Sequence, residues 1–115
     1  TSPDEMPTLD ELIAGYQELI TRAHKADVAA ILATVTPLDP ELALDSSREG
    51  FRIAVNDWIR RAGHEFVDFD AAIRSEIEPS RLENTYAAPD HTHPNVNGQK
   101  RLAQTMVDNL ARMQL

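Results

Sequence analysis

Cysteine is absent from this chain of 115 residues, so disulfides and thiolate chemistry are excluded. Long apolar runs are absent too, and no stretch approaches the roughly 18 apolar residues that a membrane span needs. Positive charge is in deficit, because 11 lysines and arginines stand against 19 acids and leave a formal net charge of −8. This balance argues against binding to nucleic acid, whose phosphates would repel the chain.

The start of the chain lacks both an initiator methionine and a signal-type apolar segment, since it reads Thr1-Ser2-Pro3. We therefore expect either that a segment has been removed or that the chain is one piece of a longer one. The acidic excess is concentrated in residues 1–50, which carry ten acids and three bases, against nine and eight in residues 51–115. A solvated acidic face accounts for this asymmetry.

Three amphipathic helices and two strands are predicted from the apolar spacing. The first helix begins at a Thr8–Glu11 capping box and ends near Lys25. Another follows a possible capping box at residues 46–49 and ends at Gly63, and the last runs from about Val96. The predicted strands are residues 28–35, which are apolar on both alternating sides, and residues 65–69. The expected inner faces of the second and last helices comprise Phe51, Val55, Trp58, Ile59 and Ala62, and Leu102, Ala103, Met106, Val107 and Leu110.

Alternation of helices with buried strands indicates an α/β fold built around a parallel sheet. Two strands make a poor sheet, however, and a strand that is apolar on both sides needs neighbours on both edges. The chain is therefore expected to be the second half of a larger doubly wound domain.

The run APDHTHPN, residues 88–95, is the strongest candidate for chemistry. Asp90 and His93 are three residues apart, and in a tight turn this spacing lets the carboxylate reach Nδ1 of the imidazole while Nε2 points outward. Open α/β sheets also place their sites near the carboxyl ends of strands. Two other interpretations stay open: a metal site using His91 and His93, and a hydrogen-bonded loop that leads into the last helix.

A second motif, Val55-Asn56-Asp57, resembles the G-x-N-D signature of certain esterases. It lacks the glycine and falls inside an amphipathic helix, so we expect Asn56 and Asp57 on the solvent side and assign them no catalytic role.

Nearly the whole chain resembles the C-terminal half of SGNH (GDSL-type) hydrolases, a superfamily of serine esterases and lipases. The resemblance is carried by LDELIAGYQELITRAH, ILATVTPLDP, VNDWIRRAGHEFVDFDAAIR and YAAPDHTHPNVNGQKRLA. In that family a D-x-x-H-P block precedes the last helix, and here it matches Asp90, His93 and Pro94. Asn95 and Gly98 also fit the pattern that follows the block.

The resemblance implies that residues 1–115 are the C-terminal portion of a single domain, a three-layer α/β/α sandwich with a parallel sheet. It also implies that Asp90 and His93 are the acid and base of a catalytic triad that hydrolyses esters without metal or organic cofactor. Many relatives are exported, and a cysteine-free chain is compatible with export.

The nucleophilic serine and the oxyanion hole of that family lie N-terminal to the region matched here. None of the serines in this chain stands in a G-D-S or G-x-S context: Ser2, Ser46, Ser47, Ser75 and Ser80. The expected partner is therefore the N-terminal half of the domain, on the same or a separate chain. A non-catalytic module that associates through exposed sheet edges is the main alternative.

Overall fold

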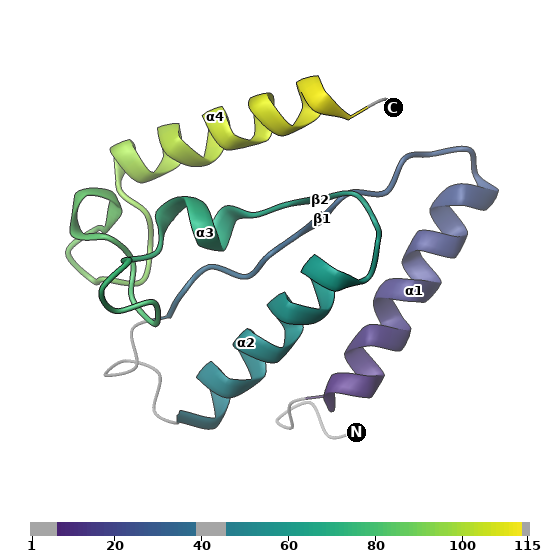
Figure 1. Cartoon of the computed structure of the whole chain (residues 1–115), viewed down its shortest axis with the longest axis horizontal. Helices are drawn as coiled ribbons and strands as arrows, with labels where there is room; N and C mark the ends of the chain where they lie inside the picture. Colours follow the sequence, from purple (N-terminus) through teal and green to yellow (C-terminus); the bar gives the residue numbers. More distant parts are fainter. Residues whose placement is uncertain (1–6, 39–45, 114–115) are drawn as a thin grey trace.

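The computed structural model describes residues 7–38 and 46–113, which form a mixed α/β structure. Helices lie on both sides of a pair of parallel strands, with α1 and α2 on one side and α4 on the other (Figure 1). No helix in this part of the chain is long and apolar enough to cross a bilayer. The elements in chain order are α1 (Leu9–Lys25), β1 (Leu32–Ala33), α2 (Ser46–Arg61), β2 (Phe66–Val67), α3 (Phe69–Ile73), the 3₁₀ helix η1 (Asn84–Tyr86) and α4 (Val96–Arg112).

Helix α1 begins and ends where the sequence predicts. The Glu11 amide donates to Thr8 Oγ1 at 3.1 Å, and the Thr8 amide donates to Glu11 Oε1 at 3.2 Å, so the predicted capping box is confirmed. Tyr16 of this helix stacks on Trp58 of α2, with ring centroids 5.8 Å apart and planes 6° from parallel. The stacked rings join the two helices on their side of the sheet.

Helix α2 supplies much of the core. Val55 and Ile59 are buried, as their spacing predicts, and the chain leaves the helix at Gly63, whose φ of 83° suits a residue without a Cβ. The capping box predicted at residues 46–49 rests on the Ser46 side chain, which lies outside the described residues. Glu49 instead binds Arg52 through both carboxylate oxygens.

The strand predicted over residues 28–35 is wrong in its length and in its burial. Only Leu32 and Ala33 form β1, which pairs in parallel with Phe66 and Val67. Val28 is 56% exposed and Val35 is 41% exposed. The apolar pattern predicted a neighbouring strand on each edge of β1, whereas the described residues provide one partner strand, β2.

The second predicted strand is also shorter than expected. Phe69 begins α3 instead of ending β2, because the Asp68 side chain caps that helix by accepting a hydrogen bond from the Ala71 amide at 3.0 Å. In α4, Leu102 and Met106 are half-buried, but Ala103, Val107 and Leu110 are exposed, so the inner face predicted for this helix is only partly covered.

Candidate active site

The segment between η1 and α4 forms a tight turn that brings Asp90 and His93 together. Asp90 Oδ2 lies 2.5 Å from His93 Nδ1, and Asp90 Oδ1 accepts hydrogen bonds of 3.0 Å from the amides of Thr92 and His93. The side chains of His93 and Asp90 are 76% and 48% exposed. Within residues 7–38 and 46–113, Nε2 of His93 has no hydrogen-bond partner, so it is available to a group from outside.

Asp90 is held in its ionised form. The His93 amide, the His93 ring and the Thr92 amide all favour the carboxylate and lower the pKa of Asp90 well below its usual value. The carboxylate therefore stays charged throughout the pH range in which an imidazole exchanges its proton. This is the electrostatic condition that a group holding a catalytic histidine must meet.

The turn lies at the end of the molecule toward which the strands run. From β2 the chain passes into α3, and the segment leading into α4 follows at the same end (Figure 1). Two isolated bridges, between Arg74 and Leu82 and between Ala87 and Pro94, organise this region. The position agrees with the general placement of sites at the carboxyl ends of parallel strands.

The geometry does not support the metal interpretation of His91 and His93. That interpretation assumed an extended backbone, but His91 has φ of 60°, in the left-handed region. One ring nitrogen of His93 is already engaged by Asp90. Across the described ranges, no group of three or more histidine, aspartate or glutamate side chains is placed to hold a metal ion.

The prediction that Asn56 lies on the solvent side of its helix is wrong. Asn56 is 1% exposed instead of facing solvent, while Asp57 is exposed as predicted. The side-chain Oδ1 of Asn56 accepts a hydrogen bond from the Val35 amide at 2.7 Å, and its Nδ2 donates to the Val35 carbonyl at 2.9 Å. Asn56 thus satisfies the backbone just beyond β1, a structural role that the helical pattern of α2 could not reveal.

A buried ionic network at the carboxyl ends of the strands was not anticipated from the sequence. Asp70, 2% exposed, accepts hydrogen bonds from Arg52 at 2.7 Å, Arg60 at 2.9 Å and Arg74 at 2.7 Å. Arg52 also donates to the carbonyls of Val35 and Pro79. The only signal in the sequence was a charge at Arg52, between core positions of an amphipathic helix.

Asp68 makes the stability of this region depend on pH. Burial by itself would raise its pKa, but hydrogen bonds from Arg60, the Ala71 amide and Thr34 outweigh burial and hold the pKa below the ordinary value of 3.8. A carboxylate whose pKa is depressed in the folded state stabilises that state above the unfolded pKa, and this contribution is lost as the pH falls through the folded pKa.

We therefore expect the free energy of unfolding to decline as the pH falls below about 4, with Asp68 and Asp90 both contributing. Urea titrations between pH 7 and pH 2.5 measure this, and Asp68→Asn should make the decline shallower. An unfolding free energy that stays constant from pH 5 to pH 2.5 would contradict the expectation.

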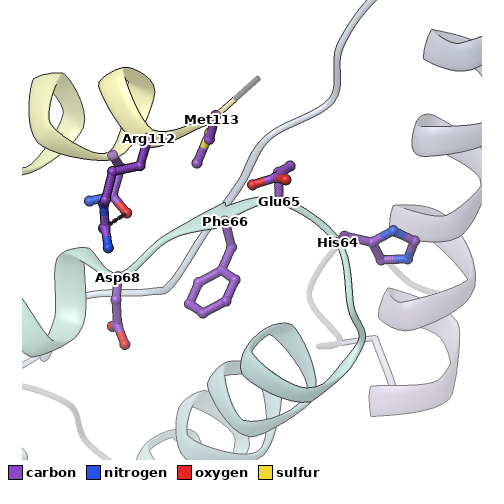
Figure 2. Close-up of a pocket in the computed structure, with 7 residues that line it drawn as sticks. His64, Glu65, Phe66, Asp68, Arg112 and Met113 are labelled. Atoms are coloured by element: carbon purple, nitrogen blue, oxygen red, sulfur yellow. Dashed lines mark hydrogen bonds between the residues drawn. The ribbon is translucent and has the colours of Figure 1, made fainter. Parts of the chain in front are cut away.

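A cavity of about 420 Å³ lies away from the Asp90–His93 turn, along β2 and beneath the end of α4. Figure 2 shows Arg112 and Met113 on one side of it and Phe66 and Asp68 on the other. The Arg112 guanidinium donates to Asn109 Oδ1 at 2.7 Å. His64 and Glu65 complete the lining, which holds no hydroxyl or thiol nucleophile.

No family model matches the sequence, and no curated protein matches it either. Solved structures do match. A GDSL-like lipase from Bacteroides thetaiotaomicron VPI-5482 aligns with 95% of this chain at a TM-score of 0.68 and 13% identity. A "putative acylhydrolase" from Bacteroides fragilis NCTC 9343 aligns with 95% of the chain at a TM-score of 0.69 and 14% identity.

The chain has the fold of about half a GDSL-type hydrolase. It spans 55% of the lipase and 54% of the acylhydrolase, and this partial coverage is consistent with the C-terminal half expected from the sequence. The resemblance to GDSL-type hydrolases is thus confirmed at the level of fold. At this sequence identity the match concerns the fold, and the roles of individual residues must be argued from their geometry.

Proposed function

We propose that this chain is the C-terminal portion of a single serine ester hydrolase domain, a three-layer α/β/α sandwich, and that it supplies the triad base His93 and its partner Asp90. The observation that carries the proposal is the 2.5 Å contact between Asp90 and His93 Nδ1, which leaves Nε2 facing outward on a 76% exposed side chain. The nucleophilic serine and the oxyanion hole belong to the N-terminal portion, on the same or a separate chain.

The reaction is acyl transfer to water. The serine hydroxyl attacks the ester carbonyl carbon while His93 Nε2 takes its proton, and the imidazolium then protonates the departing alcohol as the carbon–oxygen bond breaks. A water molecule releases the acyl group by the same two proton transfers. Asp90 keeps the second proton on Nδ1 and stabilises the imidazolium. The proposed chemistry requires neither a metal nor an organic cofactor.

The open edge of β1 is the proposed docking position for the N-terminal portion. Leu32 and Thr34 direct their amides to β2, so the neighbouring residue Ala33 directs its own toward the other edge, where no described strand pairs with it. Residues 28–35 contain no charge or proline to discourage pairing. The radius of gyration of 15.2 Å, compared with about 13 Å for a compact domain of this length, also favours an incomplete domain.

A non-catalytic association module is the second candidate, and the same open edge favours it. In that case two copies of the chain would cover the exposed apolar residues on either side of β1 and those of α4 without any nucleophile. The two candidates differ in stoichiometry and in activity, so one experiment separates them.

The experiment mixes this chain with the polypeptide encoded immediately upstream of Thr1 and follows hydrolysis of p-nitrophenyl acetate and butyrate. We expect a rate close to the uncatalysed one for this chain alone and substantial hydrolysis from a one-to-one complex, with size-exclusion chromatography reporting the stoichiometry. A one-to-one complex without hydrolysis would overturn the hydrolase proposal. If the chain self-associates, hydrolyses neither ester and does not bind the added polypeptide, the association module is favoured.

A further inference from the structure

Asn95 lies between the Asp90–His93 turn and α4, next to the Ala87–Pro94 bridge that forms the base of the turn, and it makes five hydrogen bonds, one of them a helical bond that its carbonyl accepts from the Gln99 amide at 2.9 Å. Its side-chain Nδ2 donates to the carbonyls of Thr85 at 3.0 Å and Ala87 at 3.1 Å. Its amide donates to the Tyr86 carbonyl at 2.8 Å. Its Oδ1 accepts from the Gly98 amide at 2.8 Å and so caps α4. One side chain therefore joins the segment entering the turn to the helix that follows it.

Within the turn, Asp90 Oδ1 accepts hydrogen bonds from the amides of Thr92 and His93, and the His91 amide donates to the Ala88 carbonyl at 2.9 Å. His93 is 76% exposed and Asp90 48% exposed, so core packing does not fix their positions. The loop closes at its base through the Ala87–Pro94 bridge and through the Ala88 amide, which donates to the His93 carbonyl at 2.8 Å. The Asn95 donor to Ala87 lies directly beside this closure. The position of the closed turn relative to η1 and α4 thus depends on bonds made by residue 95.

Gly98, in the first turn of α4, allows the helix to pack closely against Tyr86 and Pro94 because it has no Cβ. A Cβ at position 98 would lie 2.5 Å from the Tyr86 carbonyl oxygen and 2.8 Å from the Pro94 Cβ, both far inside normal contact distances. Gly98 is buried despite standing in the first turn of α4. Any side chain there would push η1 and Pro94 away from the helix and open the base of the turn.

We infer that Asn95 is a positioning residue for the catalytic pair: its Nδ2 donors fix the base of the turn, and through it the contact between His93 and Asp90. This inference rests on the proposed function for its catalytic meaning. Its structural content, the dependence of the Asp90–His93 contact on Asn95, can be measured on this chain without any hydrolysis.

The central variant is Asn95→Ser. A serine at this position still caps α4 through its hydroxyl, because serine is a favourable N-cap residue, but it cannot reach the carbonyls of Thr85 and Ala87. Carboxyl-carbon NMR titration of Asp90 is the readout. In the unaltered chain the pKa of Asp90 should lie far below its usual range, because the His93 amide, the His93 ring and the Thr92 amide hold the carboxylate. In Asn95→Ser it should rise toward the usual range, and the Nδ1–H tautomer of His93 should lose its dominance in ¹⁵N spectra.

Two further variants keep the test decisive. Gly98→Ala leaves Asn95 in place and should produce the same shift by displacing Tyr86 and Pro94, so it serves if Asn95→Ser folds poorly. Thr8→Ala removes the N-cap of α1, far along the chain from the turn, and should leave the Asp90 titration unchanged. In the assembled hydrolase, Asn95→Ser should lower kcat by about 10- to 100-fold with little change in KM, since misplacing a reacting group by about 1 Å costs on that order.

The outcomes separate the two proposals. If Asp90 titrates far below its usual range in the unaltered chain and does so equally in Asn95→Ser, the inference about Asn95 is overturned while the proposed function stands. If Asp90 titrates in its usual range in the unaltered chain, the Asp90–His93 contact is absent and both proposals fall. If Thr8→Ala shifts Asp90 as much as Asn95→Ser does, the effect is general loosening, and the positioning role is rejected.

Discussion

Replacing His93 with alanine is expected to lower kcat of the assembled hydrolase by a factor of about 10⁴ to 10⁶, the range found when the base of a serine triad is removed. Without the imidazole no group accepts the serine proton, so the hydroxyl remains a weak nucleophile. The measurement is hydrolysis of p-nitrophenyl butyrate by the one-to-one complex. Labelling of the serine by a fluorophosphonate should be lost in parallel, because that reaction needs the same activated oxygen.

His91→Asn is the matched control for this prediction. His91 is also exposed and lies two residues away, and its φ of 60° is one that asparagine adopts readily, so the turn should keep its shape. We expect kcat within about twofold of the unaltered enzyme, since His91 takes no part in the proposed proton transfers. If His91→Asn and His93→Ala impaired the enzyme equally, the assignment of His93 as the base would be wrong.

Asp70→Asn is expected to destabilise the chain by about 3–5 kcal/mol, the usual cost of removing one partner from a buried ion pair. The Asp70 side chain is 3% exposed and receives one hydrogen bond from each of Arg52, Arg60 and Arg74. A neutral amide would remove one of the two carboxylates that pair with Arg52, itself only 7% exposed, and leave Glu49 as its remaining acidic partner. Urea unfolding followed by circular dichroism measures the change.

The surface pair of Arg22 and Glu18 provides the comparison. These side chains are 74% and 63% exposed and meet at 2.7 Å, the same distance as Arg52 and Asp70. Because water screens exposed charges, Glu18→Gln should cost less than about 1 kcal/mol. Similar losses from Asp70→Asn and Glu18→Gln would mean that the network around Asp70 is solvated and does not stabilise the carboxyl ends of the strands.

The elements best predicted from the sequence were those with local causes. The capping box at Thr8 depends on residues three apart, and the end of α2 at Gly63 depends on a single backbone conformation. The Asp90–His93 contact belongs to the same class, because both partners sit on one short turn. The catalytic role of that pair remains a prediction that the proposed assays will test.

The predictions that failed depended on distant neighbours. The strand expected at residues 28–35 assumed flanking strands, and its described part is paired on one edge alone. Asn56 was placed on the solvent side because its neighbours Val55 and Trp58 defined a buried stripe, yet its amide is satisfied by the Val35 backbone, 21 residues away. Helical periodicity carries no information about such a partner.

By itself, the sequence determined the three long helices, the capping box at Thr8 and the pairing of Asp90 with His93, because each of these follows from side chains within a few residues of one another. Only the tertiary structure decided which polar groups are buried. Asp70 forms ion pairs with three arginines. Asn95 binds η1 through a hydrogen bond, and Gly98 packs closely against the Tyr86 carbonyl. The reason is physical: a buried charge or amide is tolerated only where the fold supplies its hydrogen-bond partners, and most of those partners come from other elements of the chain.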